Sequence, residues 1–270
     1  MDQKYIFRCK SSEAHVIKVL SELLQTNIKT GSFEISSRKI ELTMTDNNKH
    51  ILLKLEMYAG EFDYYEIHKE KLCIGLNHIH LYKMLRTVKK KDSLELIIES
   101  ENPSWLCIRI IPKEKNRVTT SQIKIHNTQS LEVEIPEGYG KSMVIASSEF
   151  QKAVKDIQNI GNTILIESND TSVIFKCNAG NIYTREIQFG SNFDKPCDLE
   201  KEQTTTTSQV FDMEVFIRVI KVAMLHSTLH VFQKEALPLM IRTNVSTLGK
   251  LSIYIKSKDQ ILRTTHLIEE

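Results

Sequence analysis

The chain is poor in glycine and has no closely spaced pair of cysteines. Only nine of its 270 residues are glycine. Gly140-Lys141-Ser142 resembles the end of a phosphate-binding loop, but Ile135 stands where that loop needs a glycine, so nucleotide binding is not expected. The five cysteines are scattered along the chain: Cys9, Cys73, Cys107, Cys177 and Cys197. This pattern argues against a disulfide framework and against a zinc ribbon.

Long apolar segments are also missing. No stretch approaches the ~20 apolar residues that a membrane-spanning helix requires. The N-terminal residues Met1-Asp2-Gln3-Lys4 do not resemble the apolar core of a signal peptide. The sequence therefore predicts a soluble, intracellular protein with no membrane partner.

No group of residues has the composition of a catalytic or metal site. The closest candidates for metal ligands are Cys73, His78 and His80 in one half of the chain and His226 and His230 in the other. Zinc needs three or four ligands in suitable geometry at one place. The carboxylates Glu61 and Asp63 lie in a polar turn with no nucleophile or histidine beside them. We therefore expect no catalytic residue, no metal and no cofactor.

Net charge gives little indication of a partner. Charged residues make up 26% of the chain and hydrophobic residues 41%, which are ordinary values for a globular protein, and the formal net charge is only +2. Any binding of nucleic acid must therefore depend on where the cations lie, not on their excess.

Alternation of apolar and polar residues with a period of two dominates the chain and predicts β-strands. The alternating apolar residues Phe33 and Ile35 are followed, after a polar break, by a second alternating set, Ile40, Leu42 and Met44. Two such segments separated by a short polar break predict a hairpin. The same alternation marks further strands at residues 51–57, 94–98, 106–110, 164–166, 173–175, 229–231, 239–241 and 251–255.

Only four stretches have helical periodicity. Their apolar faces are Ala14, Ile17, Leu20 and Leu24; Ile79, Tyr82 and Leu85; Phe150, Ala153, Val154 and Ile157; and Phe211, Val215, Phe216 and Val219. The candidate N-caps are Ser11, Ser12, Asn77, Ser147, Ser148 and Asp212. One helix followed by several strands thus recurs four times at similar intervals.

The repeat predicts an α+β fold with two similar domains, each carrying two helices on an antiparallel sheet. A polar segment that ends in Ile135-Pro136-Glu137-Gly138 separates the two halves. We predict an N-terminal domain at residues 1–124, a connecting linker at residues 125–138 and a C-terminal domain at residues 139–270.

Each predicted helix carries cations on the side opposite its apolar face. Residues three or four apart share a helix face. The cations of these faces are Lys18, Lys83, Arg86, Lys90, Lys152, Lys155, Arg218 and Lys221, with His15, Gln25, His80, Thr87 and Asn159 beside them. One such face alone is typical of a solvated helix. If the four faces lie on one concave surface, their cations can bind the phosphates of the DNA backbone without recognising the base sequence.

Three segments resemble the proliferating cell nuclear antigen family of DNA sliding clamps. The first runs from Phe33-Glu34-Ile35-Ser36-Ser37 to Met44-Thr45-Asp46, and the second from Ser148-Glu149-Phe150 to Ile160-Gly161-Asn162. The third comprises Leu237-Pro238-Leu239 and the residues from Gly249 to Ile255. Their order and spacing make the resemblance extend over the whole chain.

The resemblance implies a homotrimeric ring that encircles double-stranded DNA and tethers DNA polymerase and repair proteins. The cations that match the family's inner wall are Lys18, Lys83, Arg86, Lys152, Lys155 and Lys221. Gln25 and Glu214 stand where the family carries basic residues, and we expect His15, Arg218 and the run Lys89-Lys90-Lys91 to compensate for them. Edge strands at residues 117–125 and 182–188 would close the ring between neighbouring copies. The further partners implied are a clamp loader and PIP-box client peptides, and the implied location is the nucleus or a site of viral DNA replication.

The resemblance also places a pocket for client peptides beneath the linker. The matching residues are Thr45, Val133, Ile135, Pro136, Pro238, Tyr254 and Ile255. The family continues with Leu-Ala-Pro-Lys after the tyrosine, whereas this chain has Ile255-Lys256-Ser257-Lys258, so the client motif stays open.

Two alternatives remain open from the sequence. One is a subunit of a heterotrimeric, checkpoint-type clamp, which would share the fold without forming a ring of identical copies. The other is a nuclease or another DNA-modifying enzyme on a β-rich scaffold, against which the lack of a clustered acidic metal site argues.

Overall fold

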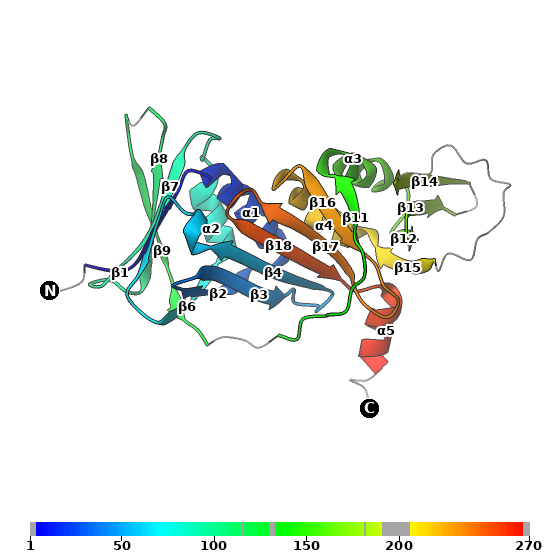
Figure 1. The fold of residues 1–270 in the computed structure, drawn as a ribbon, viewed down its shortest axis with the longest axis horizontal. Coiled ribbons are helices and arrows are strands. Elements are labelled where there is room, and N and C mark those ends of the chain that lie inside the picture. Colours follow the sequence, from blue (N-terminus) through cyan, green and yellow to red (C-terminus); the bar gives the residue numbers. More distant parts are fainter. Residues whose placement is uncertain (1–3, 115, 130–132, 181, 191–205, 267–270) are drawn as a thin grey trace. The chain divides into compact units, whose positions relative to one another are not determined.

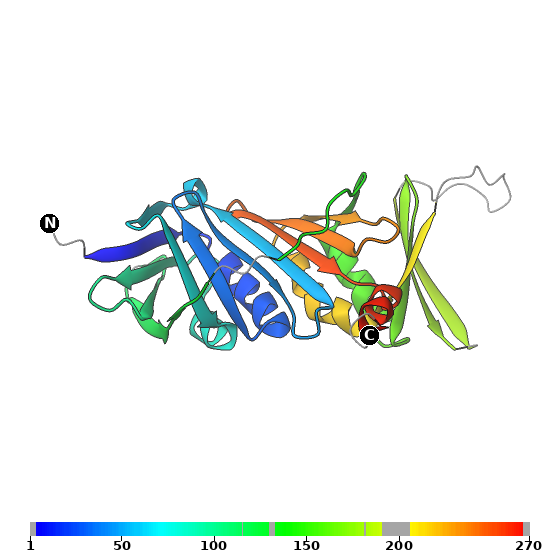
Figure 2. The ribbon, with the colours of Figure 1, turned by 90° about the horizontal axis from the view of Figure 1, so that it is seen from below.

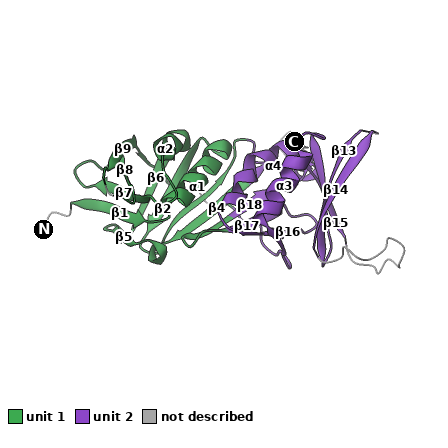
Figure 3. Ribbon diagram, turned by 90° about the horizontal axis from the view of Figure 1, so that it is seen from above, with its two compact units in different colours: residues 1–47, 52–133, 244–251 green, residues 48–51, 134–243, 252–270 purple. Residues whose placement is uncertain are grey.

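The computed structural model describes residues 4–114, 116–129, 133–180, 182–190 and 206–266. The chain forms two compact units (Figure 3). Unit 1 contains residues 1–47, 52–133 and 244–251, and unit 2 contains residues 48–51, 134–243 and 252–270. Each unit therefore includes one short segment from the other half of the sequence.

Unit 1 consists of antiparallel strands and two helices. Its elements are β1 (Tyr5–Ser11), α1 (Ala14–Asn27), β2 (Thr30–Ser36), β3 (Lys39–Thr45), β4 (Ile51–Tyr58), the 3₁₀ helix η1 (Ala59–Glu61), β5 (Tyr64–Ile67), β6 (Lys71–Asn77), α2 (His78–Leu85), β7 (Ser93–Glu99), β8 (Trp105–Ile111), β9 (Thr119–Lys124) and β10 (His126–Asn127). One sheet has the order β5-β1-β7-β8-β9, and in the other β10-β6-β2-β3-β4 is followed by β18 (Gly249–Ile255), whose first residues belong to unit 1. Helices α1 and α2 pack against each other (Figures 1 and 2).

Unit 2 repeats this plan. Its elements are β11 (Met143–Ala146), α3 (Ser147–Ile157), β12 (Thr163–Ser168), β13 (Ser172–Ala179), β14 (Tyr183–Gly190), β15 (Thr207–Asp212), α4 (Met213–Val219), the 3₁₀ helix η2 (Ile220–Met224), β16 (Thr228–Phe232), β17 (Leu239–Val245), β18 (Gly249–Ile255) and α5 (Lys258–His266). The strand orders are β14-β13-β12-β15 and β18-β17-β16-β11.

The two units have equivalent strand orders. The order β4-β3-β2-β6 in unit 1 corresponds to β14-β13-β12-β15 in unit 2, and β1-β7-β8-β9 corresponds to β11-β16-β17-β18. Each of the four helices α1 to α4 directly follows a strand and precedes the next set of strands. The predicted α+β fold of two similar domains is thus confirmed.

The hairpin predicted from period-two alternation is strands β2 and β3. Ile35 lies opposite Ile40 and Glu34 lies opposite Glu41. Because alternate side chains point to opposite faces, Phe33, Ile35, Ile40 and Leu42 are buried while Glu34 and Glu41 are partly exposed. The pattern therefore defined both the strands and the face that enters the core.

The helix starts were only partly predictable. Asn77 and Asp212 cap α2 and α4, because their side chains accept hydrogen bonds from the backbone N–H of His80 and Glu214. The predicted serine caps are wrong. Ser147 is the first residue of α3 and its N–H donates to the carbonyl of Ser227, while Glu13 precedes α1 without a side-chain cap.

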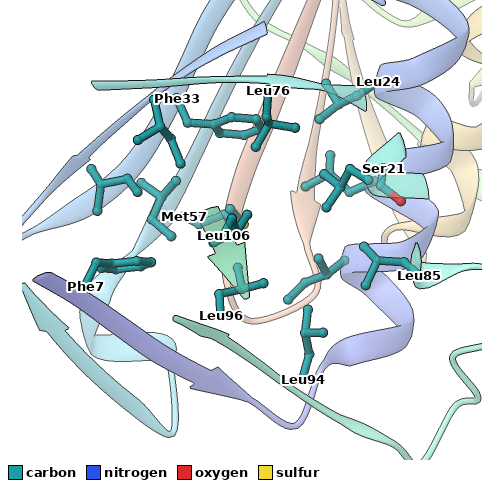
Figure 4. Close-up of a pocket in the computed structure, with 16 residues that line it drawn as sticks. Phe7, Ser21, Leu24, Phe33, Met57, Leu76, Leu85, Leu94, Leu96 and Leu106 are labelled. Atoms are coloured by element: carbon teal, nitrogen blue, oxygen red, sulfur yellow. The ribbon is translucent and has the colours of Figure 1, made fainter. Parts of the chain in front are cut away.

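The two cores differ in composition. In unit 1, helices α1 and α2 pack leucine and isoleucine side chains onto strands of both sheets, around an internal cavity of about 60 Å³ (Figure 4). In unit 2, Phe175 lies edge-to-face against three other rings, with centroids 5.2–6.2 Å apart. Those rings belong to Phe150, Phe189 and Phe216.

Helix α5 was not predicted from the sequence. It begins with a reciprocal cap, in which the N–H of Ser257 donates to Gln260 Oε1 over 2.9 Å and the N–H of Gln260 donates to Ser257 Oγ over 3.3 Å. Ser-x-x-Gln is the sequence signature of this capping box. The helix lies against β15 (Figures 1 and 2).

Candidate nucleic-acid interface and partner sites

The predicted cations of unit 1 come from α1, α2 and the turn that follows α2. Lys83, Arg86 and Lys90 are exposed, and within the described ranges none has a carboxylate at ion-pair distance. Lys18 is half-buried, and its Nζ donates to the carbonyl of Val88 over 3.1 Å. Lys18 therefore links α1 to the segment after α2 as well as adding charge.

The pKa of His15 indicates that these cations lie close together. Burial, followed by the positive charges of Lys18 and Lys90, holds the pKa of His15 below its usual value of 6.5. Lys18 is on α1, whereas Lys90 follows α2. Two cations far apart in the sequence thus act on one imidazole, which indicates a concentrated positive potential on this side of unit 1.

Unit 2 carries a more balanced set of charges. On α3, Lys152 Nζ lies 2.7 Å from Glu149 Oε1, and this carboxylate raises the pKa of Lys152. Lys155 is exposed, but the exposed Asp156 adjoins it in sequence. The net positive charge with which α3 can attract a phosphate is consequently smaller than the number of its lysines suggests.

Arg218 and Lys221, both partly exposed, do not lie on one continuous α-helix. Helix α4 ends at Val219, and Lys221 belongs to the 3₁₀ helix η2, which packs against α3. Tightening of the last turns is common at helix ends, and it changes which residues share a face. Whether Lys221 shares a face with Arg218 across this change of helix type stays a prediction.

The predicted residues of the client pocket are divided between the units, with Thr45 and Val133 in unit 1 and the remainder in unit 2. In unit 2, Ile135, Pro136 and Pro238 are partly exposed, whereas Tyr254 and Ile255 are buried. The set as a whole stays a prediction.

Tyr139 is a residue of this region that sequence reasoning missed. Its hydroxyl donates to the carbonyl of Pro238 over 2.8 Å, and its ring contacts those of Phe232 and Tyr254. Burial and the neighbouring Tyr254 raise the pKa of Tyr139, so its hydroxyl stays a donor. The aromatic position directly after Gly138 was a signal in the sequence, but its partners lie far along the chain. We call Tyr139, Phe232, Pro238 and Tyr254 the aromatic wall.

Two strand edges coincide with the segments predicted to close a ring. Strand β9 ends the order β5-β1-β7-β8-β9, and β14 ends the order β14-β13-β12-β15. Large apolar side chains are exposed at both places: Val118 is 47% exposed, Tyr183 51% and Ile182 86%. Exposed edges with apolar side chains are typical sites of pairing with another chain.

Among the described residues, no group of three or more His, Cys, Asp or Glu side chains is arranged to hold a metal ion. His78, one of the candidate ligands, is fully buried, and its Nδ1 lies 2.8 Å from the carbonyl oxygen of Ile28. In the described part of the chain, no helix combines the length and the apolar character that crossing a membrane requires.

Comparison with known proteins identifies the class of protein. A family model described as the N-terminal domain of proliferating cell nuclear antigen matches residues 6–133, and the model of the C-terminal domain matches residues 134–258. The chain is 22% identical over 259 residues to the proliferating cell nuclear antigen of Chaetomium thermophilum, covering 94% of this chain and 98% of that protein. It is 23% identical over 260 residues to the probable DNA polymerase sliding clamp 1 of Paramecium bursaria Chlorella virus 1, covering 94% and 97%.

These matches and the repeated α+β units define a DNA sliding clamp. The chain belongs to the proliferating cell nuclear antigen family. It is a divergent member whose function is that of a polymerase processivity factor, and the family is not catalytic. The resemblance stated from the sequence is confirmed, and nothing in the comparisons supports a checkpoint-type clamp.

Proposed function

We propose that three copies of this chain form a closed ring around duplex DNA, with β9 of one copy paired to β14 of the next. The observation that carries the proposal is the equivalence of strand orders between the units. Strand β14 corresponds to β4, and β9 corresponds to β18.

Within unit 1, the start of β18 already lies alongside β4. The N–H of Tyr58 donates to the carbonyl of Leu248 over 2.8 Å, and Lys250 Nζ lies 3.3 Å from Glu56 Oε2. A Cβ at Gly249 would clash with the carbonyl of Glu56, so these two backbones approach closely. Pairing of β9 with β14 from a second copy would repeat this arrangement at the two edges that correspond to β18 and β4.

In such a ring, the cations of α1 to η2 provide a sequence-independent surface for phosphates. These cations are Lys18, Lys83, Arg86, Lys90, Lys152, Lys155, Arg218 and Lys221. Weak, salt-dependent contacts suit a protein that must slide, because the closed ring and not the affinity keeps it on DNA. The modest net charge of +2 is compatible with this role.

The ring would tether DNA polymerase and PIP-box client peptides, and a clamp loader would open it. The aromatic wall of unit 2 supports a client site, since aromatic anchors are enriched where short peptides bind. The proposed location is the nucleus or a site of viral DNA replication, as expected for a relative of a eukaryotic and a viral clamp.

Light scattering coupled to size-exclusion chromatography tests ring closure. The unmodified chain should have the mass of three copies. Replacing the exposed Ile182 and Tyr183 by aspartate should give single copies, because two carboxylates would be buried at each junction. Met224→Asp is the matched control, since Met224 is also exposed, at 47%, but lies on η2. A single-copy mass for the unmodified chain at micromolar concentration would contradict the proposal.

A further inference from the structure

Helix α5 lies beyond the part of the chain that the family models match. The C-terminal match ends at residue 258, where α5 begins. An isolated helix of nine residues is marginal in water. The capping box of Ser257 and Gln260 supplies local stability to its first turn. The helix is therefore an addition to the clamp fold, with its own signal for starting.

Helix α5 is linked to the aromatic wall through strand β15. It packs on β15, and from β15 the side chain of Gln209 donates through Nε2 to the carbonyl of Leu237 over 2.9 Å. The next residue, Pro238, accepts the hydroxyl of Tyr139. Along the chain, α5 follows Tyr254 after only three intervening residues. Both routes, through contacts and along the backbone, join α5 to the place where client peptides are proposed to bind.

The packing of α5 on the protein is weak. Leu262 is 59% exposed, and Ile261 is only partly covered. Two buried polar atoms of this region, Gln260 Nε2 and Gln209 Oε1, have no hydrogen-bond partner among the described residues. Buried polar atoms without partners raise the free energy of the docked state. Because one cap and partial apolar contacts hold α5 in its docked position, undocking the helix should cost little free energy.

We infer that α5 is an autoinhibitory strap for the client-peptide site. Docked on β15, which is hydrogen-bonded to the segment leading into Pro238, it would occupy the surface onto which a bound peptide extends beyond its apolar anchors. A client must then displace α5 or bind with fewer contacts. The inference rests on the proposed client-peptide site and adds a mode of regulation to it.

Titration of a fluorescent PIP-box-type peptide tests the strap, with anisotropy as the readout. The full chain is compared with a chain that ends after Ser257 and with Gln260→Gly, which breaks both the capping box and the helix. If α5 is docked about nine-tenths of the time, its removal should tighten the apparent Kd by about tenfold. Gln260→Gly should change the Kd in the same direction, and it covers the case in which the shortened chain does not fold.

Arg263→Lys is the matched control, because Arg263 is an exposed residue of α5 and lysine keeps both the charge and the helix. It should leave the Kd unchanged. Hydrogen exchange of the α5 amides should accelerate when the peptide binds to the full chain.

Three other outcomes would overturn the inference. Weaker binding by the shortened chain would make α5 an added docking surface. Equal affinity of the full and shortened chains would show that α5 does not inhibit peptide binding, while the proposed client site would remain supported. Binding by none of the proteins would contradict the client site itself, and the strap with it.

Discussion

The two units share one strand order but present their cations differently. In unit 1, Lys83, Arg86 and Lys90 are exposed, and among the described residues they have no carboxylate partner. In unit 2, Lys152 is paired with Glu149, and Glu214 is exposed on α4. The comparison teaches that a repeated fold does not imply a repeated electrostatic surface. For a ring around DNA, it predicts that Lys83, Arg86 and Lys90 each contribute more to binding than Lys152 does.

The cores differ as well, and this gives the largest predicted effect. Phe175 in unit 2 and Phe7 in unit 1 are both fully buried phenylalanines, with exposures of 0% and 1%. Replacement of either by alanine should cost about 3–5 kcal/mol. Phe175 contacts three other phenylalanine rings, whereas Phe7 contacts only that of Tyr65 among the described residues. With each ring pair worth about 0.5–1.5 kcal/mol, Phe175→Ala should be worse by about 1–3 kcal/mol.

Equilibrium unfolding in urea measures this difference, with both variants at the same protein concentration because assembly adds to stability. Equal destabilisation by Phe7→Ala and Phe175→Ala would mean that the phenylalanine cluster contributes no more than its buried area.

The second prediction concerns DNA. Joint replacement of Lys83, Arg86 and Lys90 by alanine should flatten the dependence of log K on log salt, by about 0.9 for every phosphate that a subunit no longer neutralises. Joint replacement of Lys152, Lys155 and Lys221 should flatten it less, because Glu149, 2.7 Å from Lys152 Nζ, competes with phosphates for this lysine. Affinities for a linear duplex between 50 and 200 mM salt, roughly the range over which this effect is large, give both slopes. Identical slopes for the two sets would remove the asymmetry between the units.

Much of the fold was predictable, because buried faces impose a strict period on the sequence. Every strand predicted from alternation is present, and most of the alternating apolar residues are buried, with Met44 and Leu96 only partly covered. Edge strands such as β5 and β14 contain no fully buried residue, so their composition carries a weaker signal. Helix α5 was not predicted for a related reason. Because the helix is only partly buried, Ile261 and Leu262 are its only large apolar residues, and two residues do not define a helical period.

The site was less predictable, because contacts rather than residue types decide what a cation does. Lys18 and Lys152 looked equivalent in the sequence, yet one donates to a backbone carbonyl and the other pairs with a carboxylate. Tyr139 was missed because its significance comes from Phe232, Pro238 and Tyr254, which lie far along the chain. Local periodicity contains no information about such partners.

The third prediction reverses the asymmetry. Glu149→Gln should free Lys152 and steepen the salt slope of DNA binding by up to about 0.9 per subunit. Glu41→Gln is a matched control, because Glu41 pairs with Lys39 on the β2–β3 hairpin and its replacement changes the net charge equally. If both variants steepen the slope alike, total charge and not the position of Lys152 governs binding.

The smallest predicted effect is a pH dependence reported by His15. Its folded pKa lies below 6.5 because of burial, Lys18 and Lys90, so the folded state binds fewer protons than the unfolded state just below that value. The contribution of His15 to stability is therefore complete above pH 6.5 and is lost as the pH falls through the folded pKa. Bound phosphates would oppose the two lysines and raise this pKa, so DNA affinity should increase slightly as the pH falls below 6.5.

Titration of the imidazole signals by NMR, with and without a short duplex, measures both effects. Lys90→Met should raise the pKa of His15 in the free protein, whereas Lys155→Met on α3 should not, because Lys155 is not among the charges that act on His15. A pKa that stays constant when duplex is added would place the α1 face away from the phosphates. That result would leave the clamp fold intact but would shift the expected path of DNA from the face where the cations of unit 1 converge.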